Sequence, residues 1–194
     1  MMNELNSKNH LRQSSRVKRD RFGDEYILHA SEIVCELIAQ TNEFLFADTV
    51  LLYYPINNEI SPLPLMKAAI KMGKSVAFPV CQRADKTLLF RIVDGLDDLK
   101  QADFGLFEPN AALKIATPTE KTLCIVPAIL FSREGYRIGY GGGYYDRFLK
   151  NFNGTSMGIT YDELLFDSIP HEAHDVPLNM IISESEVLYI AEKN

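Results

Sequence analysis

The hydrophobic pattern of the first forty residues is helical. Between residues 26 and 38, apolar side chains recur at intervals of three and four, after a helix start signal at Gly23 and Asp24. Ahead of this stretch, basic residues at intervals of four, four and three place positive charges on one helical face: Lys8, Arg12, Arg16 and Arg19. Taken alone, such a face is more often a solvated surface or a loose basic arm than a binding site.

From residue 49 onward, apolar runs alternate with helical segments. Strands are predicted over residues 49–54, 75–80, 88–93, 123–131, 156–160 and 186–190. One helix opens at Ser61 and Pro62 and closes at Gly73, and another begins at Tyr144. Residues 94–110 form a polar connection between two of the predicted strands.

This alternation predicts one α/β domain over residues 1–194. Continuous apolar strands separated by helices are typical of a mostly parallel sheet covered on both faces, which is a three-layer α/β/α fold. The chain of 194 residues has no internal repeat, low-complexity segment or evident linker, and it is long enough to bury one good core.

Composition indicates an ordinary globular protein. The net charge of −6 argues against general nucleic-acid binding, although residues 1–21 hold six basic and only two acidic side chains. The three cysteines are far apart and form no CxxC pair, which suits a reducing compartment. No secretory signal is evident, and the longest apolar run, residues 123–131, is too short to span a membrane. We therefore expect a cytoplasmic protein.

The densest chemical feature is the glycine-rich segment at residues 137–147. Four glycines fall within five positions, with Arg137 and Arg147 at the two ends and Asp146 after the last glycine. The segment lies between a predicted buried strand and a predicted helix, the usual setting of a phosphate site, because glycine backbone amides approach an anion closely.

Other interpretations of this loop stay open on the residues alone. It is not a Walker A loop, since no Gly-Lys-Ser/Thr follows. It comes close to a dinucleotide-binding fingerprint, with Asp162 near the place of a ribose-binding acid, but Tyr144 stands where the third glycine belongs. A glycine-rich turn that only connects strand and helix is a further alternative.

Four motifs, in the family's order, resemble 5-formyltetrahydrofolate cyclo-ligases, also called methenyltetrahydrofolate synthetases. The segment 137–147 resembles the family signature, and residues 8–12 resemble its N-terminal Lys-x-x-Leu-Arg element. Residues 54–60 are similar to its first strand and folate-binding turn, and residues 169–175 to its late Pro…His-Asp loop. The similarity therefore runs through nearly the whole chain.

The resemblance implies an enzyme that converts 5-formyltetrahydrofolate to 5,10-methenyltetrahydrofolate, with ATP as co-substrate and Mg²⁺. In the implied mechanism, the formyl oxygen attacks the γ-phosphate, nitrogen 10 closes on the activated carbon, and phosphate leaves. The implied partners are the folate and ATP, without nucleic acid or membrane, and the protein is expected to be a monomer. The family's architecture is similar to that of phosphosugar isomerases and CoA-transferases.

The resemblance also implies roles for individual residues. Catalytic roles fall on Arg137 and Tyr144, and Asp146 and Asp175 are the implied Mg²⁺ ligands. Seen alone, Asp146 could equally be a charge that favours a helix N-terminus, and Asp175 a turn residue. The implied ATP-binding set joins the basic helix to the glycine loop: Lys8, Asn9, His10, Leu11, Arg12, Arg137, Ile138, Gly139, Tyr140, Gly141, Gly142, Gly143, Tyr144 and Tyr145.

The folate is implied to lie against Glu59, whose carboxylate can accept paired hydrogen bonds from the amino-pyrimidine edge of a pterin. The implied folate-binding set is Tyr54, Glu59, Tyr140, Gly141, Gly142, Gly143 and Tyr144. Arg16 and Arg19 keep the interpretation of a solvated face. Without the resemblance, Tyr54 is more often a core residue and Glu59 a solvated loop charge.

Three further interpretations complete the analysis. His171 and His174 are three residues apart in a predicted loop, whereas a zinc-protease helix needs them four apart, so we expect no zinc. A phosphosugar isomerase or CoA-transferase-like enzyme would need an activated carboxylate and no ATP. A sugar-phosphate sensor domain would normally adjoin a DNA-binding module, for which the chain offers no obvious segment.

Overall fold

A mostly parallel sheet forms the centre of the molecule. The computed structural model describes residues 2–102 and 105–191, and within them seven strands follow the order β12-β11-β9-β6-β1-β2-β3. The inner pairs are parallel, and the two edge strands, β3 and β12, pair antiparallel with their neighbours. The predicted mixed α/β fold with a mostly parallel central sheet is therefore confirmed, while the likeness to phosphosugar isomerases and CoA-transferases stays a prediction.

The strands of this sheet are short. Their bounds are β1 Thr49–Leu51, β2 Ser75–Gln82, β3 Thr87–Val93, β6 Thr122–Val126, β9 Thr155–Ile159, β11 Met180–Ile182 and β12 Val187–Tyr189. A second small sheet contains β10 Leu165–Phe166, β7 Leu130–Ser132 and β8 Arg137–Ile138, and a third pairs β4 Leu99–Gln101 with β5 Phe107–Pro109. The helices are α1 Met2–Arg19, α2 Asp24–Ala39, α3 Asn42–Phe46, α4 Leu63–Lys71 and α5 Tyr144–Leu149.

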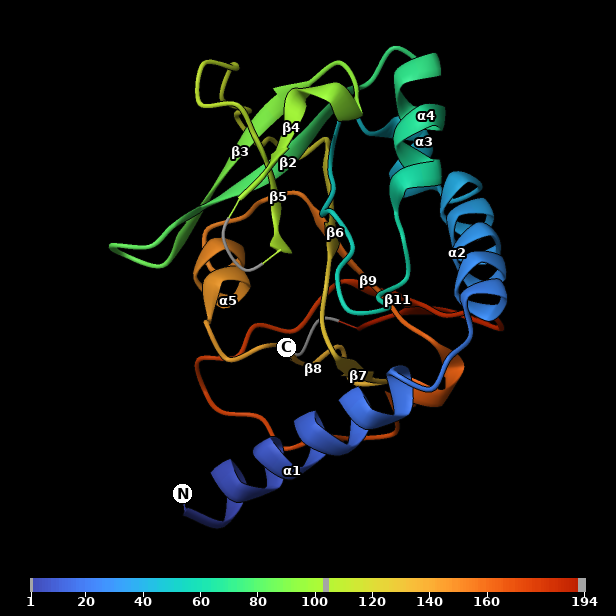
Figure 1. The fold of residues 1–194 in the computed structure, drawn as a ribbon, viewed down its shortest axis with the longest axis vertical. Helices are drawn as coiled ribbons and strands as arrows, with labels where there is room; N and C mark the ends of the chain where they lie inside the picture. The colour runs from blue at the N-terminus through green and yellow to red at the C-terminus, as the bar shows by residue number, and fades with distance from the viewer. Residues whose placement is uncertain (1, 103–104, 192–194) are drawn as a thin grey trace.

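Helices cover both faces of the central sheet, because its strands are apolar on both sides. Leu123 and Ile125 of β6 belong to the core cluster that includes buried side chains of α2 and α4. Cys124 and Val126 of the same strand point to the opposite cluster, which includes Leu149 of α5. In Figure 1, α2 and α4 accordingly lie on one side of the sheet and α5 on the other, while α1 crosses one end of the molecule.

The predicted single strand at residues 123–131 is wrong in one respect. The strand β6 ends at Val126, and Leu130 begins β7 in the second sheet. Pro127 separates them, because proline lacks the N–H needed for a central strand's ladder. The chain then turns back through β7 and β8, and the Ile129 N–H donates to the Ile138 carbonyl at 2.9 Å. This turn places the start of the glycine loop close to the end of β6.

The helical prediction for the first forty residues holds for α1 and α2, which are separated by a break at residues 20–23. The predicted connection 94–110 contains the β4–β5 pair, and β11 had no strand prediction. Both were missed because three-residue strands are too short to show a period.

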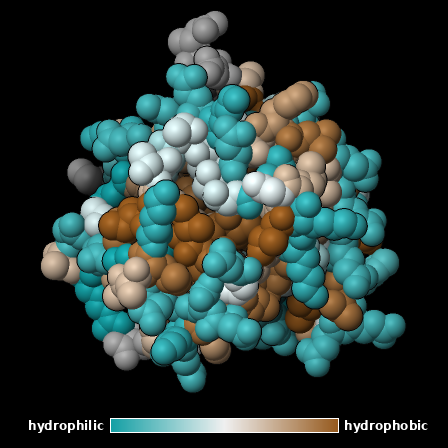
Figure 2. Space-filling model, turned by 90° about the horizontal axis from the view of Figure 1, so that it is seen from above, coloured by the Kyte–Doolittle hydropathy of each residue, from teal (hydrophilic) through white to brown (hydrophobic). Residues whose placement is uncertain are grey.

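Apolar side chains gather in the middle of one face of the molecule (Figure 2). Figure 2 shows this face from above, with hydrophilic side chains around the apolar ones. In the part of the chain that the structure describes, no helix combines the length and apolar character needed to cross a bilayer.

Gly158 of β9 is the most closely packed glycine in the central sheet. This packing predicts that a larger side chain at this position destabilises the fold. A Cβ at this position would overlap the Phe131 ring and lie 2.8 Å from the Cδ1 atoms of Leu178 and Ile181. We expect Gly158→Ala to lower the free energy of unfolding by about 1–3 kcal/mol, the usual cost of overpacking a core. Gly95→Ala is the matched control, because nothing lies within 4 Å of its added Cβ. Equal urea unfolding midpoints for the two variants would contradict this packing.

Candidate active site

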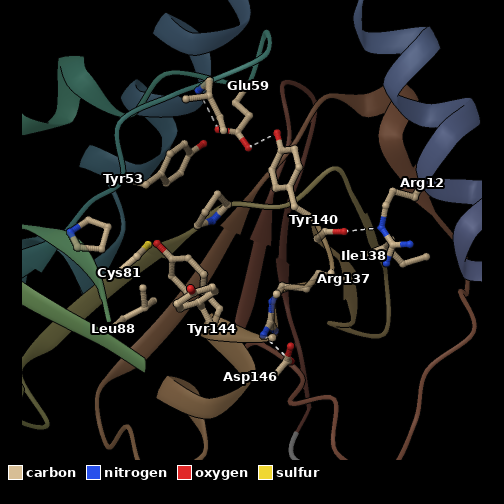
Figure 3. A pocket seen from close by; sticks show the side chains of 18 of the residues that line it. Arg12, Tyr53, Glu59, Cys81, Leu88, Arg137, Ile138, Tyr140, Tyr144 and Asp146 are labelled. Carbon is tan, nitrogen blue, oxygen red and sulfur yellow. Dashed lines mark hydrogen bonds and ion pairs between the residues drawn. The ribbon is translucent and has the colours of Figure 1, made fainter. Parts of the chain in front are cut away.

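One large cavity lies between α1, the glycine loop and the segment that follows β1. Its volume is about 580 Å³, which is in the usual range for small-molecule sites. Figure 3 shows side chains from several elements pointing into it, including Arg12 of α1, Glu59 and the glycine-loop residue Tyr140. The cavity is also lined by β2, β3, β5 and the loop that contains Glu172 and Asp175.

A tight turn after β1 directs Glu59 into this cavity. Asn57 and Asn58 have positive φ angles of 49° and 59°, a conformation that asparagine tolerates better than most residues. The turn closes with the Glu59 N–H donating to the Ile56 carbonyl at 3.1 Å, and the Ile56 N–H donates to Glu59 Oε2 at 3.0 Å. The carboxylate is thus fixed by its own turn.

Glu59 is a buried acid, not the solvated loop charge that the sequence alone favours. It is 5% exposed, and Oε1 accepts a hydrogen bond from the Tyr140 hydroxyl at 2.9 Å. Burial raises the pKa of Glu59 to about 7, although the Ile56 amide, the charge of Arg19 and the Tyr140 hydroxyl all act to lower it. The group therefore titrates near neutral pH.

The glycine loop adopts a shape that only glycine allows at several points. Gly141 and Gly143 have φ angles of 94° and 68°, and a Cβ at Gly142 would meet the ring of Tyr144. Two arginines hold the loop by its carbonyls: Arg12 Nε donates to Gly139 O at 2.8 Å, and Arg147 Nη1 donates to Gly142 O at 3.0 Å. With these carbonyls bound, the loop is fixed at both ends beside the cavity.

Lys8 of α1 does not project freely into solvent. Lys8 Nζ donates to Asp175 Oδ2 at 2.6 Å and to Glu172 Oε2 at 3.2 Å. Burial alone would lower the pKa of Lys8, but the two carboxylates raise it above its ordinary value. Burial alone would likewise raise the pKa of Asp175, which its bond to Lys8 lowers. Lys8 therefore stays charged and holds Asp175 ionised.

Arg137 lines the cavity, but its side chain is largely buried and already paired. Its Nη2 donates to Asp146 Oδ1 at 2.6 Å, and its Nη1 donates to the Val176 carbonyl at 2.7 Å. The Val176 N–H in turn lies 3.4 Å from Asp146 Oδ1, so Asp146 contacts the residue that follows Asp175. Glu172, His174 and Asp175 each offer one potential metal-ligand atom within 4.8 Å of the others.

Nearly all of the proposed site residues line the cavity. The exceptions are His10, which is exposed, and Leu11, which packs against the core. Tyr54 lines it and stacks on Phe107 at a centroid distance of 4.4 Å. The histidines of the 171–174 segment lie in a loop, as predicted.

One sequence-based assignment is wrong. The sequence places Arg16 and Arg19 on the solvated face of α1. Arg16 is exposed, but Arg19 is buried, with only 2% of its surface exposed. Arg19 lies seven residues after Arg12 and so on nearly the same helical face, which turns toward the core once α1 packs against β8. Its Nη2 donates to the Tyr140 hydroxyl at 2.6 Å.

Sequence reasoning also missed several residues that line the cavity, among them Tyr53, Glu108 and Glu172. The Tyr53 hydroxyl donates to the Ile60 carbonyl at 2.6 Å and braces the Glu59 turn. Tyr53 and Glu172 could have been found only because they lie close to the motif residues Tyr54 and His174. No sequence feature points to Glu108.

The dinucleotide-binding alternative loses its support. Asp162, the candidate ribose acid of a dinucleotide site, accepts hydrogen bonds from Ser185 at 2.9 and 3.3 Å and does not line the cavity. Cys81 does line it, but burial raises the pKa of its thiol to about 11, so the thiol stays protonated and a poor nucleophile at neutral pH.

Comparison with known proteins identifies the family. A sequence model of the 5-formyltetrahydrofolate cyclo-ligase family matches residues 4–184. This chain belongs to that family. Family membership makes it an enzyme of the cyclo-ligase type.

Individual relatives agree with this assignment. The chain is 33% identical over 137 residues to 5-formyltetrahydrofolate cyclo-ligase of Haemophilus influenzae, covering 68% of this chain and 73% of that protein. It is 28% identical to a probable cyclo-ligase of Caenorhabditis elegans, covering 93% and 94%. The solved structure of Aquifex aeolicus 5,10-methenyltetrahydrofolate synthetase superposes with a TM-score of 0.84 at 30% identity, covering 96% of this cyclo-ligase family member and 94% of that chain.

The buried Glu59 predicts a pH dependence of stability. The pKa of Glu59 is about 7 in the folded protein, whereas its ordinary value, which applies to the unfolded chain, is 4.5. Between these values the unfolded chain loses its proton first, so Glu59 destabilises the fold increasingly as pH rises through this window and to a constant extent above it. Glu59→Gln removes this effect.

We therefore expect the unfolding free energy of Glu59→Gln, relative to the parent, to rise between pH 4.5 and 7 by up to about 1.4 kcal/mol per pH unit. If the substitution also has a cost that does not depend on pH, the variant's plot of unfolding free energy against pH shifts as a whole, and this slope does not change. Urea titrations at several pH values measure it, and parallel curves for the two proteins would contradict the burial of an ionisable Glu59.

Proposed function

We propose that this cyclo-ligase family member converts 5-formyltetrahydrofolate to 5,10-methenyltetrahydrofolate, with ATP going to ADP and phosphate and with Mg²⁺ required. The observation that carries the proposal is the single cavity that joins a glycine loop to a buried carboxylate, Glu59. A phosphate donor and an amino-pyrimidine ring need these two kinds of surface side by side.

Glu59 is the proposed pterin-recognition residue. Its two oxygens offer about four lone pairs, of which Ile56 and Tyr140 use one each. The others remain for the ring N–H groups of the folate, and Tyr54, stacked on Phe107, supplies an aromatic wall nearby. The Tyr145 hydroxyl is buried and finds no partner among the described residues, so a polar group of the substrate would satisfy it.

The glycine loop and α1 are the proposed ATP site. Phosphoryl transfer depends on positioning and on neutralising charge more than on covalent help from the protein. The Gly139–Tyr145 backbone amides would receive the phosphates, while Lys8 and Arg12 add positive charge from α1. Held next to this loop, the formyl oxygen attacks the γ-phosphate and ADP leaves. Nitrogen 10 then bonds to the carbon of the O-phosphorylated formyl group and loses its proton, and the C–O bond breaks to release phosphate. Arg137 and Tyr144 are the proposed catalytic residues at the transfer.

The carboxylates beside Lys8 fit Mg²⁺. Oxygen donors are the ligands that this ion prefers, and Asp175 and Glu172 already hold a cation, the ammonium of Lys8. We propose that Asp175, together with Asp146 across the Val176 backbone, would hold the ion. Bound there, Mg²⁺ neutralises phosphate charge. We further propose that the protein acts as a cytoplasmic monomer, without nucleic acid or membrane as partner.

The activity itself is the first test. Given 5-formyltetrahydrofolate, ATP and Mg²⁺, the protein should form the methenyl product, followed by its ultraviolet absorption, and should release phosphate in equal amount. Turnover that continues unchanged without ATP would refute the proposal.

Glu59→Gln should separate the two substrates. The substitution keeps the volume but replaces one acceptor oxygen with a donor, and a hydrogen bond to a charged group is worth about 1.5–3 kcal/mol. The dissociation constant of the folate should rise about 10- to 150-fold, while that of ATP should change less than twofold. Calorimetric titrations that show equal weakening of both ligands would place Glu59 outside the pterin site.

Lys8→Met should weaken ATP, because it removes a partly buried cation beside the glycine loop. Loss of a phosphate-directed charge corresponds to about 1.5–3 kcal/mol, or a 10- to 150-fold rise in the KM for ATP. Lys18→Met is the matched control on the same helix, since Lys18 is exposed and pairs with Glu163 at 2.8 Å. Equal KM values for ATP in both variants would show that Lys8 serves only as a partner for Asp175.

A further inference from the structure

Arg19 is a buried cation at the end of α1 with no acid directly beside it. Its Nη1 donates to the Ala128 carbonyl at 3.1 Å and its Nη2 to the Tyr140 hydroxyl at 2.6 Å. Its Nε finds no hydrogen-bond partner among the described residues. Because burying an unpaired charge is costly, this arrangement calls for a role beyond helix packing.

The contacts of Arg19 fix the direction of a hydrogen-bond chain. A guanidinium only donates, so the Tyr140 oxygen must be the acceptor. The single hydrogen of the Tyr140 hydroxyl is then free to point at Glu59 Oε1, 2.9 Å away. Figure 3 shows Tyr140 reaching from the glycine loop toward Glu59 across the top of the cavity. The chain therefore runs from Arg19 through Tyr140 to Glu59.

We propose that Arg19 is a positioning residue for substrate binding, which through Tyr140 keeps Glu59 oriented and ionised as an acceptor for the pterin ring. This inference rests on the proposed function of the same site. It gives α1 a second task, because the helix that carries Lys8 and Arg12 to the glycine loop also reaches the carboxylate at the folate end.

After the Ile56 backbone amide, the charge of Arg19 gives the ionised form of Glu59 its largest support. Glu59 raises the pKa values of four hydroxyls around it: Tyr53 after β1, Tyr140 in the glycine loop, Tyr145 of α5 and Tyr161 after β9. Of these four, Tyr140 is the one that in turn lowers the pKa of Glu59, through its hydrogen bond. Arg19 is the cation whose charge lowers the pKa of Glu59 against its burial. Without this charge, the pKa of Glu59 would rise further, so a larger fraction of Glu59 would be protonated at neutral pH and would lose an acceptor position.

Water has little room to replace Arg19. Arg19 and Glu59 share a second cavity of only about 10 Å³, which is at most the space of one water molecule. Truncating the guanidinium should therefore leave Glu59 in poorly solvated surroundings, and its protonation should respond strongly.

The test uses Arg19→Met, which keeps an apolar side chain of similar length in the buried space. We expect the KM for 5-formyltetrahydrofolate at pH 7.5 to rise about tenfold, the loss of one charge-assisted hydrogen bond, while the KM for ATP changes less than twofold. The acid limb of the kcat/KM profile for the folate should move up by about one pH unit, as expected when a neighbouring opposite charge is lost.

Three further variants separate this role from packing. Arg16→Met is the matched control, because the Arg16 guanidinium lies 6.0 Å from the Tyr140 ring centre, against 5.9 Å for Arg19, but is exposed and makes no hydrogen bond to the hydroxyl. It should leave the folate KM and the pH profile within twofold and 0.2 units, about the scale of surface charge effects. Arg19→Lys should restore part of both effects. In Tyr140→Phe, adding Arg19→Met should cost less than in the parent, because the chain is already broken.

A titration without substrate distinguishes failure of this inference from failure of the proposed function. Carbon-13 NMR of the Glu59 carboxyl should report a higher pKa in Arg19→Met than in the parent and Arg16→Met, whether or not the protein acts on the folate. An unchanged Glu59 pKa in Arg19→Met would overturn the inference, as would equal rises in the KM for folate and ATP. An inactive parent with a normal Arg19 effect on Glu59 would instead reject the folate assignment alone.

Discussion

The attachment of α1 to the segment that carries the glycine loop is the interaction on which the site depends. Arg12 binds the Gly139 carbonyl, and Arg19 binds the Ala128 carbonyl and the Tyr140 hydroxyl. These contacts hold both ends of the turn-back through β7 and β8, which exists because Pro127 ends the central strand. Without α1, the glycine loop would lose one of its anchors, and the cavity would lose one wall.

Charge in this cavity is organised in pairs rather than left open. Lys8 holds Asp175, Arg137 holds Asp146, and Arg19 supports Glu59 through Tyr140. Each pair reduces the cost of burying its members, and each places one ionised group where a ligand of the opposite sign, or a donor, would bind. A site of this kind is ready for a highly charged co-substrate and a polar heterocycle before either one arrives.

The sequence was sufficient for features that depend on local chemistry. Periodicity and the positions of glycine and proline predict the helix after Gly23, the helix between Pro62 and Gly73, and the start of α5 at Tyr144. They also predict the parallel core. Nearly all of the residues assigned to the site through the four family motifs line the cavity, although His10 and Leu11 lie outside it. The lining residues from β2, β3 and β5 belong to no motif. Long-range packing was out of reach: nothing local shows that α1 turns Arg19 inward, that Tyr140 meets Glu59, or that the three residues of β11 complete the sheet.

The central claim is that one cavity binds a triphosphate at the glycine loop and a pterin at Glu59, with α1 closing the site between them. A crystal structure with Mg²⁺, a non-hydrolysable ATP analogue and 5-formyltetrahydrofolate tests this most directly. The account predicts phosphate oxygens on the Gly139–Tyr145 amides near Lys8, and pterin N–H groups within hydrogen-bond distance of the Glu59 carboxylate. A pterin ring bound away from Glu59, or a triphosphate that contacts neither the glycine loop nor α1, would contradict it.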